Sequence, residues 1–103
     1  MNKDRYNVLI IGLGSIGLQY DIMLCADEFI LSHARAFSLH QDFNLAGGVD
    51  SSPRNREMFE REYHCGSYQS IADAKHLRVD IAVIATPTNT HYEITKEIMA
   101  TFN

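Results

Sequence analysis

Basic residues, cysteines and long apolar runs are all scarce in this sequence, and each scarcity excludes a class of protein. Nine Lys and Arg against thirteen Asp and Glu give a net charge of −4 over 103 residues. This balance argues against a nucleic-acid partner, because phosphate backbones are bound by clustered cations. The first apolar run, Val8 to Leu13, is too short for a secretion signal or a membrane span. We therefore expect a cytoplasmic protein that binds neither nucleic acid nor membrane.

The two cysteines, Cys25 and Cys65, stand far apart and show no CxxC spacing or neighbouring histidine cluster. We expect reduced thiols, no disulfide framework and no metal site. Apolar residues make up 46% of the chain, an ordinary globular composition, and the length suits one hydrophobic core. Residues 1–103 are therefore expected to form a single domain.

Alternating strand and helix patterns predict an α/β fold. Strands are predicted at Tyr6 to Ile11, at the shorter segment Asn44 to Val49 and at Asp80 to Ala85. The first and third contain the unbroken apolar runs 8–11 and 81–85, which are typical of strands buried on both faces. A short strand is expected at Gly66 to Tyr68, followed by a helical turn at Ile71 to Ala74. Strands that alternate with helices form parallel sheets with right-handed crossovers. We therefore predict a Rossmann-type parallel sheet, helices on both faces, with its strands ordered third, second, first, fourth.

Helices are predicted at Ser32 to Leu39, Arg54 to Tyr63 and Thr90 to Phe102. Pro53 suits the first turn of the second helix, with Ser51 or Ser52 as its cap. Helical spacing places one set of residues roughly on one side of the first helix and another on one stripe of the last: His33, Ala36, Phe37 and His40, and Ile94, Ile98, Met99 and Phe102.

A GxGxxG motif follows the first strand directly and is expected to open a helix. Gly12 permits a tight turn, Gly14 lets a pyrophosphate approach the backbone, and Gly17 lets helix and strand pack closely. The alternative is a glycine turn in an α/β domain that binds no nucleotide. The candidate cofactor-binding residues of the motif are Gly12, Gly14, Ser15, Ile16 and Gly17.

Asp50 closes the second strand, where an acid can hydrogen-bond the adenine ribose. A carboxylate there repels a 2′-phosphate, so NAD is favoured over NADP. Two alternatives stay open, because Asp50 could simply cap the helix that contains Pro53, and Arg54 could meet a 2′-phosphate. The acid stands 33 positions after Gly17 instead of about 20. We attribute the excess to an insertion, Leu18 to Leu31, that interrupts the first helix and either packs as a loop or touches a ligand.

The loop after the third long strand belongs at the same edge of the sheet, where open α/β folds bind ligands. Its candidate cofactor-binding residues are Thr86, Pro87, Thr88, Asn89 and His91. Asn89 or Thr90 could also cap the last helix. We do not expect His91 to be catalytic, because a histidine in the first turn of a helix is more often structural and no carboxylate partner is evident.

With these residues in place, residues 6–102 resemble the N-terminal domain of the glucose-fructose oxidoreductase and inositol dehydrogenase family. The matching stretches are GLGSIG at 12–17, SHARA at 32–36, GVD at 48–50 and ATPTNTH at 85–91. The resemblance implies NAD or NADP as cofactor and hydride transfer with a sugar, inositol or related polyol. The family's histidine near the glycine motif corresponds to His33, after the insertion.

In that family a Glu-Lys-Pro motif and a second α/β domain follow the last helix seen here. The lysine and a later histidine there supply the acid and base, and the second domain often forms the oligomer interface. This sequence ends at Asn103, before such a motif. The resemblance therefore implies no catalytic residue within these 103 residues, no turnover by the chain alone, and a homo-oligomer for the longer enzyme.

Two other functions remain open. A non-catalytic sensor could bind NAD(P) in the same fold to regulate a partner. A methyltransferase also begins with a glycine turn and uses an acid on its second strand, but it usually lacks the third spaced glycine and the Thr-Pro-Thr-Asn loop.

Overall fold

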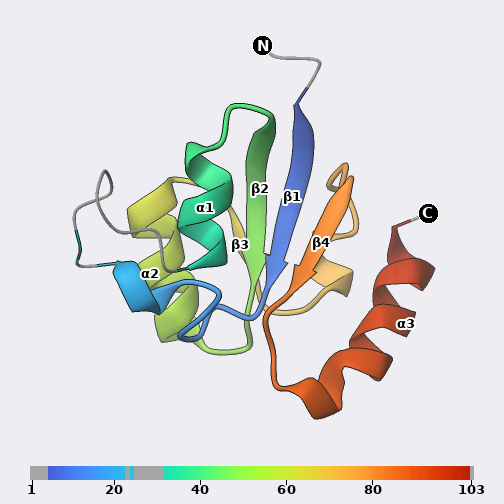
Figure 1. Ribbon diagram of the computed structural model, residues 1–103. Helices are drawn as coiled ribbons and strands as arrows, with labels where there is room; N and C mark the ends of the chain where they lie inside the picture. The colour runs from blue at the N-terminus through green and yellow to red at the C-terminus, as the bar shows by residue number, and fades with distance from the viewer. Residues whose placement is uncertain (1–4, 23, 25–31, 103) are drawn as a thin grey trace.

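A four-stranded parallel sheet forms the centre of the molecule, with the strand order β3-β2-β1-β4 (Figure 1). The computed structural model describes residues 5–22, 24 and 32–102. Its strands are β1 (Tyr6–Ile11), β2 (Phe43–Val49), β3 (Ser67–Tyr68) and β4 (Ile81–Ile84). Every pair in the sheet is parallel. The predicted fold class and strand order are confirmed.

The α-helices of the described residues lie within one residue of the predicted bounds. They are α1 (His33–Leu39), α2 (Pro53–Tyr63) and α3 (His91–Thr101). Ser32 and Ser52 cap α1 and α2, each accepting a hydrogen bond from the main chain three residues on. The described residues also form the short 3-10 helices η1 (Gln19–Asp21), η2 (Ala72–Ala74) and η3 (Thr88–Thr90).

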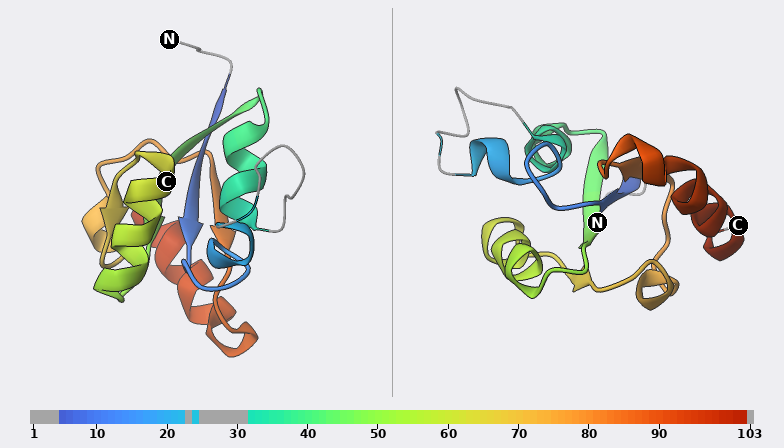
Figure 2. Two further views of the ribbon diagram at one scale, coloured as in Figure 1. Left: turned by 90° about the vertical axis from the view of Figure 1, so that its left-hand side faces the viewer. Right: turned by 90° about the horizontal axis from the view of Figure 1, so that it is seen from below.

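Helices cover both faces of the sheet, and β1 is buried between them. Figure 2, seen from below, shows α1 and α2 on one side of the strands and α3 with η2 on the other. Val8 and Ile10 of β1 pack on the first side with Phe59 of α2, while Leu9 and Ile11 face the opposite layer. Because this part of the strand is covered on both faces, its side chains from Val8 to Ile11 are all apolar.

Two of the predicted helix faces need correction. In α1 the buried residues are Ala34 and Arg35, whereas Ala36 and His40 are exposed. In α3, Met99 is 68% exposed, while the other three members of its predicted stripe pack against the sheet. Apolar periodicity misassigned α1 because it cannot anticipate a buried arginine that has a carboxylate partner.

The glycine motif makes one turn, and the helix that it opens is interrupted after η1 and resumes as α1. Main-chain hydrogen bonds join the turn directly to α1: His33 N donates to Ile16 O at 2.9 Å, and Ala34 N donates to Gly17 O at 3.0 Å. In an uninterrupted α-helix, residues 20 and 21 would donate these bonds. Residues 33 and 34 stand 13 positions later, which matches the excess spacing before Asp50. The bonds therefore agree with an insertion in the first helix, although residues 23 and 25–31 of that segment, Cys25 among them, lie outside the described residues.

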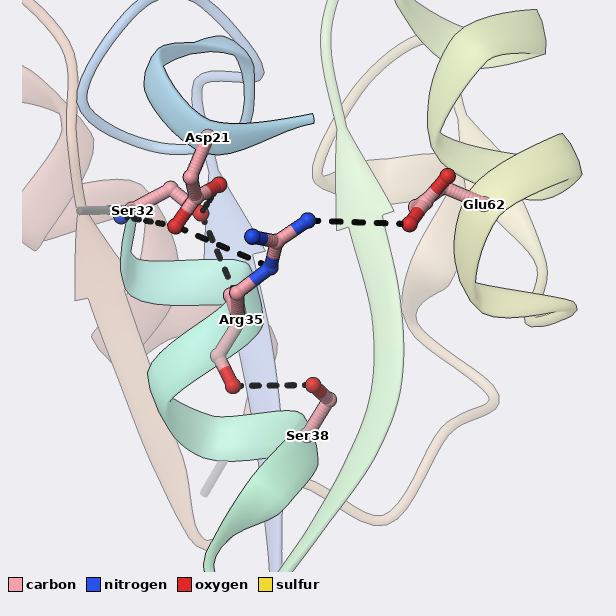
Figure 3. A network of polar contacts seen from close by, with 5 residues as sticks. All are labelled: Asp21, Ser32, Arg35, Ser38 and Glu62. Carbon is pink, nitrogen blue, oxygen red and sulfur yellow. Dashed lines mark hydrogen bonds and ion pairs between the residues drawn. The ribbon is translucent and has the colours of Figure 1, made fainter. Parts of the chain in front are cut away.

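A buried polar cluster joins the two sides of this insertion (Figure 3). The carboxylate of Asp21 accepts from Ser32 N and Ser32 Oγ, both at 2.8 Å, and lies 3.8 Å from Arg35 Nε. Arg35 also reaches Glu62 of α2, with 3.9 Å between Nη2 and Oε2. Asp21, Ser32 and Arg35 are almost fully buried. The cluster thus fixes the end of η1 to the start of α1 and ties both to α2.

Candidate functional site

A cleft of about 430 Å³ opens at the carboxyl ends of β1, β2 and β4. Its walls are the strand ends, the loops that follow them and one side of α3. Five of the predicted binding residues line it: Gly12, Gly14, Asp50, Thr86 and Pro87. The cleft lies where the strand order reverses, between β1 with β2 on one side and β4 on the other, as expected for ligand sites in open α/β sheets.

Each motif glycine occupies the position predicted for it. Gly12 has φ +100°, a conformation that favours glycine, and a Cβ there would lie 2.9 Å from the carbonyl of Ala85. A Cβ on Gly17 would lie only 2.0 Å from Gly12 O, so no larger residue fits beneath the turn. A Cβ on Gly14 would meet nothing within 4 Å. Gly12 and Gly17 therefore shape the turn, and Gly14 leaves open space over the backbone.

Four consecutive main-chain amides in this turn have no protein acceptor. Within the described residues, the N–H groups of Gly14, Ser15, Ile16 and Gly17 donate to no protein atom. The first main-chain hydrogen bond of the helical type is donated by Leu18 N to Gly14 O at 2.9 Å. Such free donors at a turn that leads into helix-like hydrogen bonding carry partial positive charge and suit an anion. The arrangement can bind a phosphate group without any cationic side chain.

Asp50 lies beside the motif and is held by the protein on both oxygens. Oδ2 accepts from Leu13 N at 2.8 Å, and Oδ1 accepts from Ser52 N at 2.9 Å. Asp50 does not cap α2 as the alternative proposed, because the Oγ of Ser52 accepts from the main chain of Asn55 at 3.2 Å. The carboxylate therefore joins the glycine turn to the end of β2 and still faces the cleft.

Sequence reasoning missed two amide side chains that complete this arrangement. Asn55 Nδ2 donates to Asp50 Oδ2 at 3.3 Å, and Asn55 Oδ1 accepts from Gln19 Nε2 at 2.9 Å. Gln19 Nε2 also donates to Leu13 O at 2.9 Å. No pattern in the sequence links residues 19 and 55, because η1 and α2 meet only in the folded chain.

The loop between β4 and α3 is held together by its own hydrogen bonds. The hydroxyls of Thr86 and Thr90 lie 2.7 Å apart, and Thr90 Oγ1 donates to Pro87 O at 2.6 Å. The Nε2 of His91 lies 2.9 Å from Thr86 O. The ring of His91 therefore hydrogen-bonds the main chain of the loop, which is a structural role. Thr90 stands at the cap position of α3 but makes no side-chain capping bond.

The other predicted binding residues lie outside the lining of the cleft. Ser15 and Ile16 are exposed on the motif turn, and Gly17 is buried beneath it. Thr88 and Asn89 are exposed in η3. Their contacts with a cofactor stay predictions.

Arg54 lies on a different side of α2, in a groove that it shares with Ile22 and Met58. The arginine nearer the cleft is Arg56, whose Nη1 donates to Asp50 O at 2.9 Å and to Ser51 O at 3.0 Å. The suggestion that Arg54 meets a 2′-phosphate therefore lacks support in this geometry.

Several lining residues were not predicted from the sequence. They are Ser51 after β2, Ser70 and Ile71 before η2, and Ile94 and Glu97 of α3. The helical spacing of Ile94 and Glu97, three apart, places them on one side of α3, but nothing in the sequence says that this side meets the cleft. Glu97 adds a second carboxylate to the lining.

Among the described residues, the side chains whose pKa is shifted lie outside the lining of this cleft. Burial raises the pKa of the Cys65 thiol, whose Sγ lies 3.4 Å from Tyr63 O. Burial also raises the pKa of the Tyr63 phenol. No cluster of three or more His, Cys, Asp or Glu side chains in the described part of the chain could hold a metal ion. None of the helices that the structure describes is long and apolar enough to cross a membrane.

Comparison with known proteins gives a consistent result. Residues 6–103 match the profile of the Gfo/Idh/MocA oxidoreductase family, NAD-binding Rossmann fold. A protein of Amycolatopsis mediterranei (strain S699), assigned by name as a UDP-kanosamine synthase oxidoreductase subunit, is 29% identical over 62 residues, which is 60% of this chain and 17% of that protein.

Two solved structures show the same fold. A protein of Sinorhizobium meliloti 1021 assigned as a myo-inositol dehydrogenase is 25% identical, with a TM-score of 0.70 over 93% of this chain and 25% of its own. The WlbA dehydrogenase of Bordetella pertussis, solved with NADH and UDP-GlcNAcA, is 17% identical, with a TM-score of 0.75 over 98% of this chain and 26% of its own. The chain thus spans about a quarter or less of the length of these relatives.

Proposed function

Because the chain belongs to the Gfo/Idh/MocA oxidoreductase family and forms its NAD-binding Rossmann domain, we propose that the cleft at the ends of β1, β2 and β4 holds NAD. In this proposal the amides of Gly14 to Gly17 bind the pyrophosphate and Asp50 accepts from the adenine ribose. Thr86 and Pro87 form the wall on the side of β4.

The observation that carries the proposal is the open space over Gly14 beside four amides that lack an acceptor. Buried or crowded turns satisfy such amides within the protein, because an unmade hydrogen bond costs about 1–3 kcal/mol. Here an anionic ligand can satisfy them, and the missing Cβ gives it room. Gly12 and Gly17 make this geometry stable, since each contacts neighbouring backbone that a side chain would displace.

We further propose that NAD is preferred over NADP. Asp50 and Glu97 both line the cleft, and its lining within the described residues includes no lysine or arginine side chain. A 2′-phosphate brought next to Asp50 would meet the like charge of its carboxylate, whereas a 2′-hydroxyl can donate to that carboxylate. Arg56 lies outside the lining, and its Nη1 already donates to Asp50 O and Ser51 O.

For the longer enzyme we propose a sugar, inositol or related polyol as substrate. The relatives support this class, because one is named for myo-inositol, one for UDP-kanosamine synthesis, and one was solved with UDP-GlcNAcA bound. The nicotinamide, when bound, exchanges a hydride with a carbinol carbon. The lining of the cleft, in the part of the chain that the structure describes, includes no lysine or histidine that could carry the alcohol proton. We therefore expect binding without turnover by the 103-residue chain.

Isothermal titration with NADH tests the proposal. The wild-type chain should bind NADH, and Gly14→Leu should abolish the binding because its side chain fills the open space. Ala36→Leu, at an exposed position of α1, adds the same side chain away from the cleft and should bind as the wild type does. Equal binding by Gly14→Leu and the wild type would place the cofactor elsewhere.

A second test separates an enzyme from a sensor. The full-length gene product should reduce NAD when supplied with inositols, sugars or UDP-sugars. Tight NADH binding with no turnover on any of these substrates would support the non-catalytic sensor.

A further inference from the structure

We propose that Gln19 and Asn55 are positioning residues that hold the carboxylate of Asp50 and the glycine turn in one frame, and thereby set the discrimination between NAD and NADP. This inference rests on the proposed function, since it concerns how the same cleft distinguishes two cofactors.

The side chains and main chain form a closed ring of hydrogen bonds. Leu13 N donates to Asp50 Oδ2 at 2.8 Å, and the same oxygen accepts from Asn55 Nδ2 at 3.3 Å. Asn55 Oδ1 accepts from Gln19 Nε2 at 2.9 Å, and that nitrogen also donates to Leu13 O at 2.9 Å. The ring begins and ends on Leu13, the residue between the first two motif glycines. It links the turn, η1, the first turn of α2 and the end of β2.

The ring determines how the carboxylate is presented. A carboxylate has about four acceptor positions, and three donors occupy Asp50: Leu13 N, Asn55 Nδ2 and Ser52 N. About one position is left for a ligand donor. A ribose 2′-hydroxyl can use it, but a phosphate oxygen at neutral pH offers no proton. Because Leu13 N is one of those donors, the carboxylate and the turn move together.

Each amide holds the other in a fixed orientation. Asn55 presents Nδ2 to the carboxylate because Gln19 Nε2 requires an acceptor on the other side of the same amide group. Loss of Gln19 leaves Asn55 Oδ1 without its donor in the ring, so that only the longer bond from Nδ2 to Asp50 still orients the Asn55 side chain. Both residues therefore act on the ribose contact through Asp50, not by touching the cofactor themselves.

The test compares the dissociation constants of NADH and NADPH for the wild-type chain, Asn55→Ala and Gln19→Ala. A hydrogen bond to a charged group contributes about 1.5–3 kcal/mol, and a neutral one about 1. We therefore expect each variant to raise the dissociation constant of NADH about fivefold or more. The dissociation constant of NADPH should rise distinctly less. The ratio of the NADPH to the NADH dissociation constant should therefore fall in both single variants. The double variant should bind NADH only slightly more weakly than the weaker-binding single variant, because the two side chains act through one contact.

Asn44→Ala is the matched control. Asn44 of β2 donates its Nδ2 to Asn7 Oδ1 at 3.0 Å, a similar side-chain bond at the opposite end of the sheet. This variant should leave both constants unchanged. Asn55→Ala is expected to fold, because the capping bond from Ser52 uses the main chain of residue 55, and thermal unfolding checks this.

Equal weakening of NADH and NADPH by Asn55→Ala and Gln19→Ala would overturn the inference, because a purely structural role lowers both affinities together. Unchanged constants for both cofactors would overturn it as well. Failure of the wild-type chain to bind NADH is a different result, which would refute the proposed function and this inference with it.

Discussion

Alanine at Gly14 and alanine at Gly17 should have opposite effects on stability, although both change a glycine of the same motif. A Cβ on Gly17 lies 2.0 Å from Gly12 O, where ordinary contact is 3.4–4 Å. The contacted atom belongs to the main chain of the same turn, so relief requires the turn itself to open. Overpacking costs typically about 1–3 kcal/mol, and we expect Gly17→Ala at or above the upper end.

Gly14→Ala meets nothing within 4 Å, and Gly12 is the glycine with a positive φ among the described residues. A glycine replaced without strain gains about 0.4–1 kcal/mol, because the unfolded chain has fewer conformations to lose. The two variants should therefore differ by about 3 kcal/mol or more in free energy of unfolding. Urea unfolding followed by circular dichroism measures the difference, and for a domain of this size about 1 kcal/mol moves the melting temperature by about 4–8 °C.

The same pair separates folding from binding. Gly14→Ala should fold as well as the wild type yet bind NADH more weakly, because its methyl group enters the space kept open beside the four amides. A Gly17→Ala chain as stable as the wild type would show that Gly17 does not lie so close to Gly12 O. A Gly14→Ala chain as unstable as Gly17→Ala would refute the open space at Gly14.

Three further predictions concern other parts of the molecule. Asp21→Ala should destabilise the fold by about 3–5 kcal/mol in urea unfolding, because it removes a buried carboxylate that pairs with Arg35; a loss under 1 kcal/mol would contradict the role of this cluster. Asp50→Ala should narrow the ratio of NADPH to NADH dissociation constants, and an unchanged ratio would remove Asp50 from the ribose contact. Burial raises the pKa of the Cys65 thiol, so in a Cys25→Ser background its alkylation by iodoacetamide should have a higher pH midpoint in the folded chain than in urea. Since the folded pKa is the higher one, the stability from this shift is present below the unfolded thiol's pKa and is lost as pH rises through the folded one.

The sheet could be predicted from the sequence because its signals are local. The run Val8 to Ile11 is apolar at every position, which only a strand covered on both faces requires, and the structure buries all four residues. The tight turn at Gly12 and the close approach at Gly17 were also predicted correctly, because these steric requirements depend on the turn itself. The order of the strands followed from general rules for parallel connections.

The insertion could be predicted from the excess spacing between Gly17 and Asp50, together with the helical pattern that begins at Ser32. The hydrogen bonds from His33 and Ala34 to the turn agree with this interpretation. The burial of Arg35 could not be predicted, since it depends on Asp21, a residue on the other side of the insertion.

The polar ring around Asp50 could not be predicted at all. Gln19 and Asn55 are unremarkable polar residues in their own segments, and their contact arises from the packing of η1 against α2. Glu97 was missed similarly, because its place in the cleft depends on how α3 sits against the sheet. Residues that act through contacts distant in sequence leave no periodic pattern.

The most direct test of the central claim is a ¹⁵N–¹H NMR titration of the 103-residue chain with NADH. The amide signals of Gly14, Ser15, Ile16 and Gly17 should shift together as the pyrophosphate binds, while those of Asn7 and Asn44 at the opposite end of the sheet stay in place. Saturable NADH binding that leaves the four motif amides unmoved would contradict the account.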